Sequence, residues 1–242
     1  VKPQCAYYEL YGWQGMRALH ETILYAKSRG LYVIIDGKRN DIGSTMAAYA
    51  AAHLGAAEAF GAAFEPFSGD ALTVNGYLGS DGIRPLLDVC KARDKAVFVL
   101  VKTSNPSSGE LQDLSLGGQT VYEKMGAFCE EWGADSVGRH GYSAVGAVVG
   151  ATYPAQLEAL RKRLPHTFFL IPGYGAQGGS AAGLSGAFDE NGVGGVVNSS
   201  RAVMCAWQRS GGDYKRAARD EALRMRGELN AGIRGFIKQA GS

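Results

Sequence analysis

The sequence lacks most features that mark membrane-spanning, zinc-binding or disulfide-linked proteins. No apolar run reaches about 18 residues, the length of a membrane-spanning helix, and no signal-peptide pattern is found. The four cysteines lie far apart and form no Cys-x-x-Cys pair, which argues against a zinc site and suggests no disulfide framework. We therefore expect a cytoplasmic protein that does not bind membranes.

A charge excess of either sign is also missing, because 25 basic and 23 acidic side chains leave a formal net charge of +2. Such a balance gives no overall attraction to nucleic acid or anionic lipid, so any anion site must be local. Glycine is abundant instead, at 35 of 242 residues, roughly twice its usual share. Without a collagen-like period, this indicates tight turns and close backbone approaches to a ligand.

The length of the chain fits a single α/β barrel, for which about 250 residues are typical. No repeat or low-complexity linker divides it, so we expect residues 1–242 to form one domain. The sequence begins at Val1, inside an apolar stretch typical of a strand. A native polypeptide rarely begins in mid-strand, so we expect that an N-terminal piece precedes it.

Short apolar runs alternate with stretches of helical periodicity. Several runs are apolar throughout, as in a parallel sheet that is buried on both faces. Helical spacing occurs from Met16 to Ala26, from Ile83 to Cys90 and from Leu157 to Leu164. This alternation predicts a parallel α/β fold. The expected strands are Val1–Ala6, Leu31–Asp36, Ala71–Val74, Ala96–Val101, Ala144–Val149, Thr167–Ile171 and Val193–Val197.

Seven strands are expected, whereas a closed (β/α)₈ TIM barrel has eight, and an open doubly wound sheet is the structural alternative. Two observations favour the barrel. Polar and glycine-rich motifs follow the C-terminal ends of strands along most of the chain, and no Gly-x-Gly-x-x-Gly follows the first strand. We predict a TIM barrel whose first strand is absent from this sequence.

The most informative segment carries Asp36 and Lys38 directly after the apolar run Val33–Ile35. Side chains two residues apart share one face of a strand, so both should point to the same side at its C-terminal end. That end is the catalytic end of a barrel. Taken alone, a salt bridge that closes the strand is the better interpretation. Asp41 lies beyond the strand and should face elsewhere.

This segment, Asp-x-Lys-x-x-Asp-Ile followed by Gly-Ser-Thr, resembles the signature of the orotidine 5′-phosphate decarboxylase family. The resemblance covers essentially the whole chain and is closest to the bacterial branch that carries Lys-Pro-Gln and Thr-Ser-Asn-Pro. Each motif is weak alone, but together, in the right order and spacing, they form a strong signal. The other matching segments are Val1–Gln4, Ala96–Pro106, Pro172–Gly179 and Val196–Arg201.

The resemblance implies loss of CO₂ from C6 of the pyrimidine ring of orotidine 5′-phosphate, which gives uridine 5′-phosphate without metal or cofactor. The resulting vinyl carbanion has no electron sink, so the protein must stabilise it electrostatically. By resemblance, Lys38 stabilises and protonates C6 while Asp36 and Asp41 hold it in place. Lys2 joins Asp36 in a chain of alternating charges. The resemblance also implies a homodimer in which Asp41 completes the partner's site.

The last third of the chain is expected to bind the phosphate. Its glycines let backbone N–H groups approach an oxyanion, and Arg201 follows the last strand, where barrels often bind phosphate. The resemblance implies that Gln177 reaches the phosphate and base, that Ser104 bonds the pyrimidine amide edge and that Thr45 faces ribose or phosphate. Without the resemblance, a turn explains Ser104 nearly as well, and a helix cap explains Thr45 nearly as well. The expected substrate-binding residues are Thr45, Ser104, Pro172, Gly175, Gln177 and Arg201.

Two rival interpretations stay open. A metal-dependent sugar-phosphate decarboxylase or aldolase of the same barrel group also carries Asp-x-Lys-x-x-Asp, although the glycine-rich loop and Thr-Ser-Asn-Pro favour the nucleotide enzyme. A non-catalytic nucleotide-binding remnant is suggested by the lack of a counterpart to the family's first-strand aspartate. The presence of Lys2, Asp36, Lys38 and Asp41 argues against a loss of catalytic residues.

Overall fold

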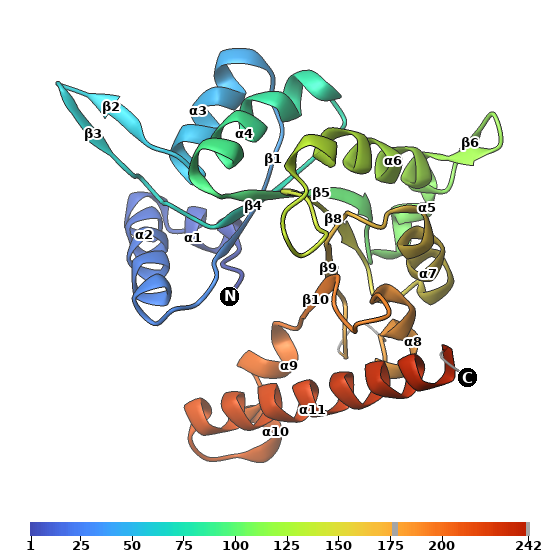
Figure 1. The fold of residues 1–242 in the computed structure, drawn as a ribbon. Helices are drawn as coiled ribbons and strands as arrows, with labels where there is room; N and C mark the ends of the chain where they lie inside the picture. The colour runs from blue at the N-terminus through green and yellow to red at the C-terminus, as the bar shows by residue number, and fades with distance from the viewer. Residues whose placement is uncertain (176–178, 241–242) are drawn as a thin grey trace. The chain divides into compact units, whose positions relative to one another are not determined.

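The computed structural model describes residues 1–175 and 179–240 (Figure 1). The chain falls into two compact units. The first unit comprises residues 1–100 and 128–147, and the second comprises residues 101–127 and 148–242. Strands β5 (Ala96–Lys102) and β8 (Val145–Val149) each run from the first unit into the second. The single domain expected from the sequence stays a prediction.

The first unit is built around β1 (Ile34–Arg39), β4 (Ala71–Val74) and β5, which pair in parallel in that order. Their apolar side chains are buried, as the continuous hydrophobic runs predict. The N-terminal residues extend the pairing, because Asp36 N donates to Pro3 O at 2.9 Å and Gln4 forms a parallel bridge with Asp36.

The helices of the first unit turn one apolar stripe inward. In α2 (Gly12–Ser28), the buried residues Leu19, Ile23 and Ala26 recur at helical spacing. Gly30 then follows at φ 72°, a left-handed conformation that glycine adopts without strain. The other elements of the unit are α1 (Cys5–Glu9), α3 (Gly43–His53), α4 (Ser80–Arg93), the 3₁₀ turn η2 (Ala134–Ser136) and the hairpin of β2 (Ala57–Ala59) with β3 (Ala62–Phe64).

The second unit contains the parallel strands β9 (Phe169–Pro172) and β10 (Gly195–Asn198). Helix α6 (Val121–Gly133) runs from this unit into the first. The long C-terminal helix is α11 (Tyr214–Ala240). The remaining elements are α5 (Gly109–Gln112), α7 (Pro154–Arg163), α8 (Ala181–Leu184), α9 (Arg201–Met204), α10 (Trp207–Ser210), the turns η1 (Pro106–Ser108) and η3 (Ser185–Ala187), and the hairpin of β6 (Ser115–Leu116) with β7 (Gln119–Thr120).

The order of strands in the main sheet is β1-β4-β5-β8-β9-β10, which follows the order along the chain. A doubly wound sheet reverses its strand order at a switch point, whereas successive barrel strands are always neighbours. The sequential order therefore supports the predicted barrel class against the open alternative. Within the described residues, no helix is long and apolar enough to cross a membrane.

Several boundaries predicted from the sequence are wrong. The strand expected over Val1–Ala6 is reduced to an isolated bridge between Gln4 and Asp36, because α1 begins at Cys5 and the Gln4 side chain caps it. The strand expected over Leu31–Asp36 lies instead at Ile34–Arg39, so that Asp36 and Lys38 are both within β1. The two hairpins were not expected, since their strands are only two or three residues long and none of them is buried.

Candidate active site

Asp36 lies at the centre of a charged cluster in the first unit. Its Oδ1 atom accepts a hydrogen bond from Lys38 Nζ at 2.6 Å, and its Oδ2 atom is paired with Lys2 Nζ. The Asp36 side chain is only 7% exposed, whereas that of Lys38 is 46% exposed. The structure therefore brings the three predicted residues together and leaves the Lys38 ammonium accessible to a ligand.

Two further side chains bind the same carboxylate and were missed by the sequence analysis. Gln4 Nε2 donates to Oδ2 at 3.1 Å, and Thr73 Oγ1 donates to Oδ1 at 2.9 Å. Gln4 is two residues after Lys2 on the same extended segment, so alternation could have identified it. The signal for Thr73 was a hydroxyl within the buried apolar strand β4, where a polar group needs a partner.

These contacts decide the charge of Asp36. Burial raises the pKa of its carboxyl group, but the charges and hydrogen bonds of Lys2 and Lys38 outweigh burial and hold the pKa below its ordinary value. Asp36 is therefore an anion near neutral pH. A buried anion with several donors has few ways to move, so it fixes the direction of the Lys38 side chain.

Lys38 has a left-handed backbone, with φ at 47°. Around it, the β1–β4 register shifts between Ile35 and Arg39, so the pairing of the strand is irregular there. The strand is therefore irregular here, but Lys38 Nζ still donates to Asp36 Oδ1, as its position two residues after Asp36 predicts. The backbone N–H of Lys38 donates to Thr73 Oγ1 at 3.0 Å, which holds this conformation. A strained residue that bears a reactive group is typical of active sites.

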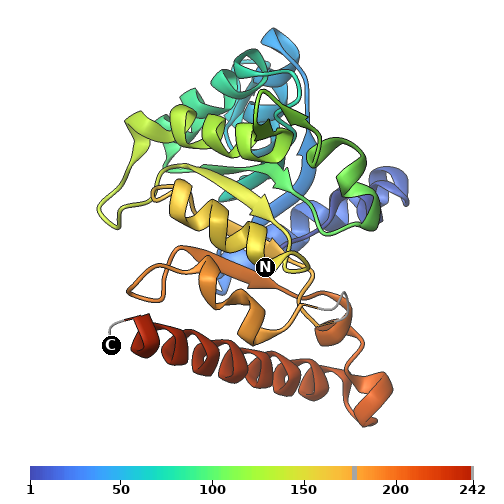
Figure 2. The ribbon, with the colours of Figure 1, turned by 90° about the vertical axis from the view of Figure 1, so that its right-hand side faces the viewer.

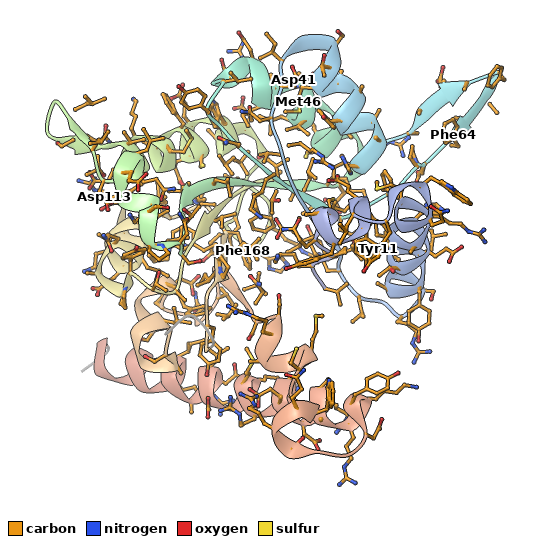
Figure 3. All side chains as sticks on the ribbon, turned by 180° about the vertical axis from the view of Figure 1, so that it is seen from behind. Tyr11, Asp41, Met46, Phe64, Asp113 and Phe168 are labelled. Atoms are coloured by element: carbon orange, nitrogen blue, oxygen red, sulfur yellow. The ribbon has the colours of Figure 1, made fainter. Side chains whose placement is uncertain are left out.

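Among the described residues, no hydrogen bond or ion pair joins Asp41 or Thr45 to the Lys2–Asp36–Lys38 cluster. Asp41 is in the connection between β1 and α3 (Figure 3), where its Oδ1 accepts from Ile42 N at 2.8 Å. Helix α3 begins at Gly43 with Ile42 as its N-cap, so the helix cap suggested for Thr45 is wrong. Thr45 lies in the first turn and is exposed.

The glycine-rich segment after β9 lies in the second unit. Gly175 has φ 73°, a conformation that favours glycine, and its N–H donates to Gly179 O at 3.0 Å. A Cβ on Gly179 would lie 2.6 Å from Ala151 Cβ, so the backbone approaches too closely for any side chain. Pro172 ends β9 and accepts a bond from Ala151 N at 2.8 Å. The two ends of this segment, at Gly175 and Gly179, are therefore held close together.

The other predicted substrate-binding residues follow strand ends. Ser104 lies after β5, and Thr152 Oγ1 donates to its carbonyl at 3.5 Å. Gly150 packs against Ser104 so closely that a Cβ would lie 2.9 Å from its backbone. Arg201 is exposed at the start of α9, three residues after β10 ends. Gln177 lies outside the described residues. The substrate contacts of Ser104, Arg201 and Gln177 stay predictions.

The sequential parallel strands and the charged cluster on a barrel strand define an α/β-barrel enzyme. The family described as "Orotidine 5′-phosphate decarboxylase / HUMPS" matches residues 1–209, and the chain belongs to this family.

Relatives of known name agree with this assignment. Orotidine 5′-phosphate decarboxylase of Rhodopirellula baltica is 53% identical over 209 residues, which are 86% of this chain and 68% of that protein. The enzyme of the same name from Caldicellulosiruptor bescii is 42% identical over 234 residues, 96% of this chain and 77% of that protein. The solved structure of Leishmania donovani OMP decarboxylase is 35% identical, with a TM-score of 0.75, over 96% of this chain and 80% of that one. The barrel fold predicted from the sequence is thereby confirmed.

Proposed function

We propose that this chain decarboxylates orotidine 5′-phosphate to uridine 5′-phosphate and CO₂, the last step of pyrimidine nucleotide synthesis, with neither metal nor cofactor. The observation that carries the proposal is the Lys2–Asp36–Lys38 cluster, in which a buried anion orients an accessible ammonium group. Relatives that are 53% and 42% identical are named for this reaction.

The cluster suits a reaction that leaves an electron pair on carbon. As the bond from C6 to the carboxylate carbon breaks, its electrons stay on C6 and CO₂ departs. The Lys38 ammonium stabilises the developing charge and then donates a proton to C6, and the neutral amine regains a proton from solvent. Because Asp36 already orients Lys38, little reorganisation is needed during the reaction.

The glycine-rich loop and Arg201 supply the phosphate site in this proposal. The phosphate is chemically remote from C6, so its binding energy can be used to hold the pyrimidine against the charged cluster. Ser104 then recognises the pyrimidine edge, Thr45 contacts ribose or phosphate, and Gln177 contributes from the loop. Arg201 suits the phosphate because bonds between a guanidinium and a phosphate are charge-assisted.

The proposal includes the expected assembly and location. We propose a homodimer in which Asp41 reaches the partner's site, which is compatible with its position on the connection beyond β1. We also propose one domain over residues 1–242 and a cytoplasmic location. All four cysteines are free, as is usual in a reducing compartment.

Direct assay tests the function. We expect purified protein to convert orotidine 5′-phosphate to uridine 5′-phosphate, with an unchanged rate after treatment with EDTA, because an ammonium group supplies the stabilising charge. Loss of absorbance of the orotate ring measures turnover. A rate that falls with EDTA and returns with a divalent metal would instead identify the metal-dependent rival, and absence of turnover would support the non-catalytic remnant.

Arg201→Ala tests the phosphate site. We expect this variant to bind uridine 5′-phosphate roughly 10- to 100-fold more weakly while its affinity for uridine stays unchanged, since only the nucleotide offers a charge-assisted bond. Calorimetric titration of both ligands measures the difference. Arg209→Ala is a poor control because Arg209 bonds α9, so Arg163→Ala on α7 serves instead. Equal weakening of both ligands would show that Arg201 has a structural role.

A further inference from the structure

Helix α11 carries a row of ion pairs that decarboxylation does not use. It packs against α8 and α9, and Figure 2 shows it running along this part of the second unit. Helix α8 follows the glycine-rich loop, and α9 begins with Arg201. Helix α11 therefore contacts an element next to each half of the proposed phosphate site, although it lies beyond the residues 1–209 that match the family.

Tyr174 connects the glycine-rich loop to α11. Its hydroxyl donates to Glu228 Oε2 at 2.7 Å, and only 6% of the residue is exposed. Its backbone carbonyl accepts from Ser199 Oγ at 3.4 Å, which links the loop to the segment just before Arg201. Tyr174 lies between Gly173 and Gly175, which gain no rigidity from side chains of their own.

The bond from Tyr174 to Glu228 persists at neutral pH. Burial, followed by the neighbouring Glu228 carboxylate, raises the pKa of Tyr174 to about 12, so its hydroxyl keeps the proton that it donates. The same bond, with help from Arg224, holds the pKa of Glu228 below its ordinary value. Near neutral pH, Tyr174 therefore keeps the proton that it donates, and Glu228 stays an ionised acceptor.

From Glu228 the contacts continue along α11 to α9. Arg224 is paired with Glu228 and, at 2.8 Å, with Glu221. Arg209 lies 3.5 Å from Glu221 and donates to Ala202 O at 3.2 Å. Ala202 is the residue that follows the candidate phosphate-binding arginine. A continuous chain of ion pairs and hydrogen bonds thus joins the glycine-rich loop to α9 through one helix.

We propose that Tyr174 and Glu228 are positioning residues for phosphate binding, through which α11 holds the glycine-rich loop and the Arg201 segment ready for the ligand. The inference rests on the proposed function, because it takes these two segments as the phosphate site. Its physical basis is preorganisation. A glycine loop has high conformational freedom, and a site that is ordered before binding spends less of its binding energy on ordering.

Three substitutions separate the hydrogen bond from the ion pair. Tyr174→Phe removes the donor and Glu228→Ala removes the acceptor, so we expect each to bind uridine 5′-phosphate about 5- to 15-fold more weakly, the equivalent of one lost hydrogen bond. Uridine affinity should not change. Glu228→Gln retains an acceptor oxygen but loses the ion pair with Arg224, so its affinity should stay close to that of the wild type.

The matched control is Glu158→Ala on α7, which removes another helix-surface ion pair, to Lys162, in the same unit. We expect no change in the affinity for either ligand. Because Glu228 is half exposed, Glu228→Ala should fold even if Tyr174→Phe does not. The double variant Tyr174→Phe, Glu228→Ala should lose no more affinity than either single variant, since all three lack the same bond.

Two results would overturn the inference. One is unchanged affinity of Glu228→Ala for uridine 5′-phosphate, and the other is an equal loss of affinity for uridine, which a purely structural role would produce. Failure of the proposed function is distinguishable. Wild-type protein that binds uridine 5′-phosphate but does not turn over orotidine 5′-phosphate would overturn the reaction, while the comparison of the two ligands would still decide the roles of Tyr174 and Glu228.

Discussion

The Lys38→Ala variant is expected to fold and to lose nearly all turnover of orotidine 5′-phosphate. A neutral methyl group can neither stabilise the C6 carbanion nor protonate it. Removal of one well-placed neutral donor from an active site costs about 2.7–4 kcal/mol, or roughly 10²–10³-fold in rate. Lys38 supplies both a full charge and the proton, so we expect a larger loss.

The backbone at position 38 makes alanine a suitable replacement. Alanine and lysine both carry a Cβ, so both are strained at φ 47°, and the substitution mainly removes the ammonium group. Initial rates at saturating substrate measure the effect. Lys162→Ala on α7, whose ammonium is exposed, is the matched control and should keep full activity. Turnover close to that of the wild type in Lys38→Ala would remove Lys38 from the mechanism.

The second large effect is recovery of activity from two inactive proteins. Asp41→Ala and Lys38→Ala should each be inactive alone. If Asp41 acts in the partner's site, a mixed dimer has one site with all wild-type residues. Random exchange would make half of the dimers mixed, so we expect activity on the order of a quarter of the wild-type value. The activity of the mixture after subunit exchange, confirmed by native mass spectrometry, is the measurement.

A second mixture controls for this recovery. Asp36 and Lys38 contact each other within one chain, so mixed dimers of Asp36→Ala and Lys38→Ala have no intact site and should stay inactive. If exchange is complete and the first mixture is as inactive as the second, Asp41 acts within its own chain. The proposed assembly would then be wrong.

The sequence predicted those features that local patterns encode. Continuous apolar runs identified β4 and β5 almost to the residue, because burial on both faces requires an unbroken run. The proximity of Asp36 and Lys38 followed from their separation by one residue. The partnership of Lys2 with Asp36 came only from the resemblance to a family, since no local pattern joins residues that far apart.

The parts that could not be predicted depend on contacts between distant segments. Thr73 looks like an ordinary strand residue until β4 is placed beside β1, where its hydroxyl meets Asp36. The irregularity of β1 around Lys38 was missed, although Gly37 lies inside it and a glycine within a strand can mark a bulge. Thr45 was given a helix cap as its alternative role because threonine is a common capping residue, whereas α3 begins at Gly43 with Ile42 as its N-cap.

The left-handed backbone of Lys38 also bears on how this sequence responds to selection. Glycine would relieve the strain there, and a residue held in this conformation costs about 1–2 kcal/mol. A library of variants screened for heat resistance alone would therefore enrich glycine at position 38 and discard the proposed proton donor. Only a screen that also demands pyrimidine prototrophy would retain lysine, so stability and catalysis impose opposite preferences on this single codon.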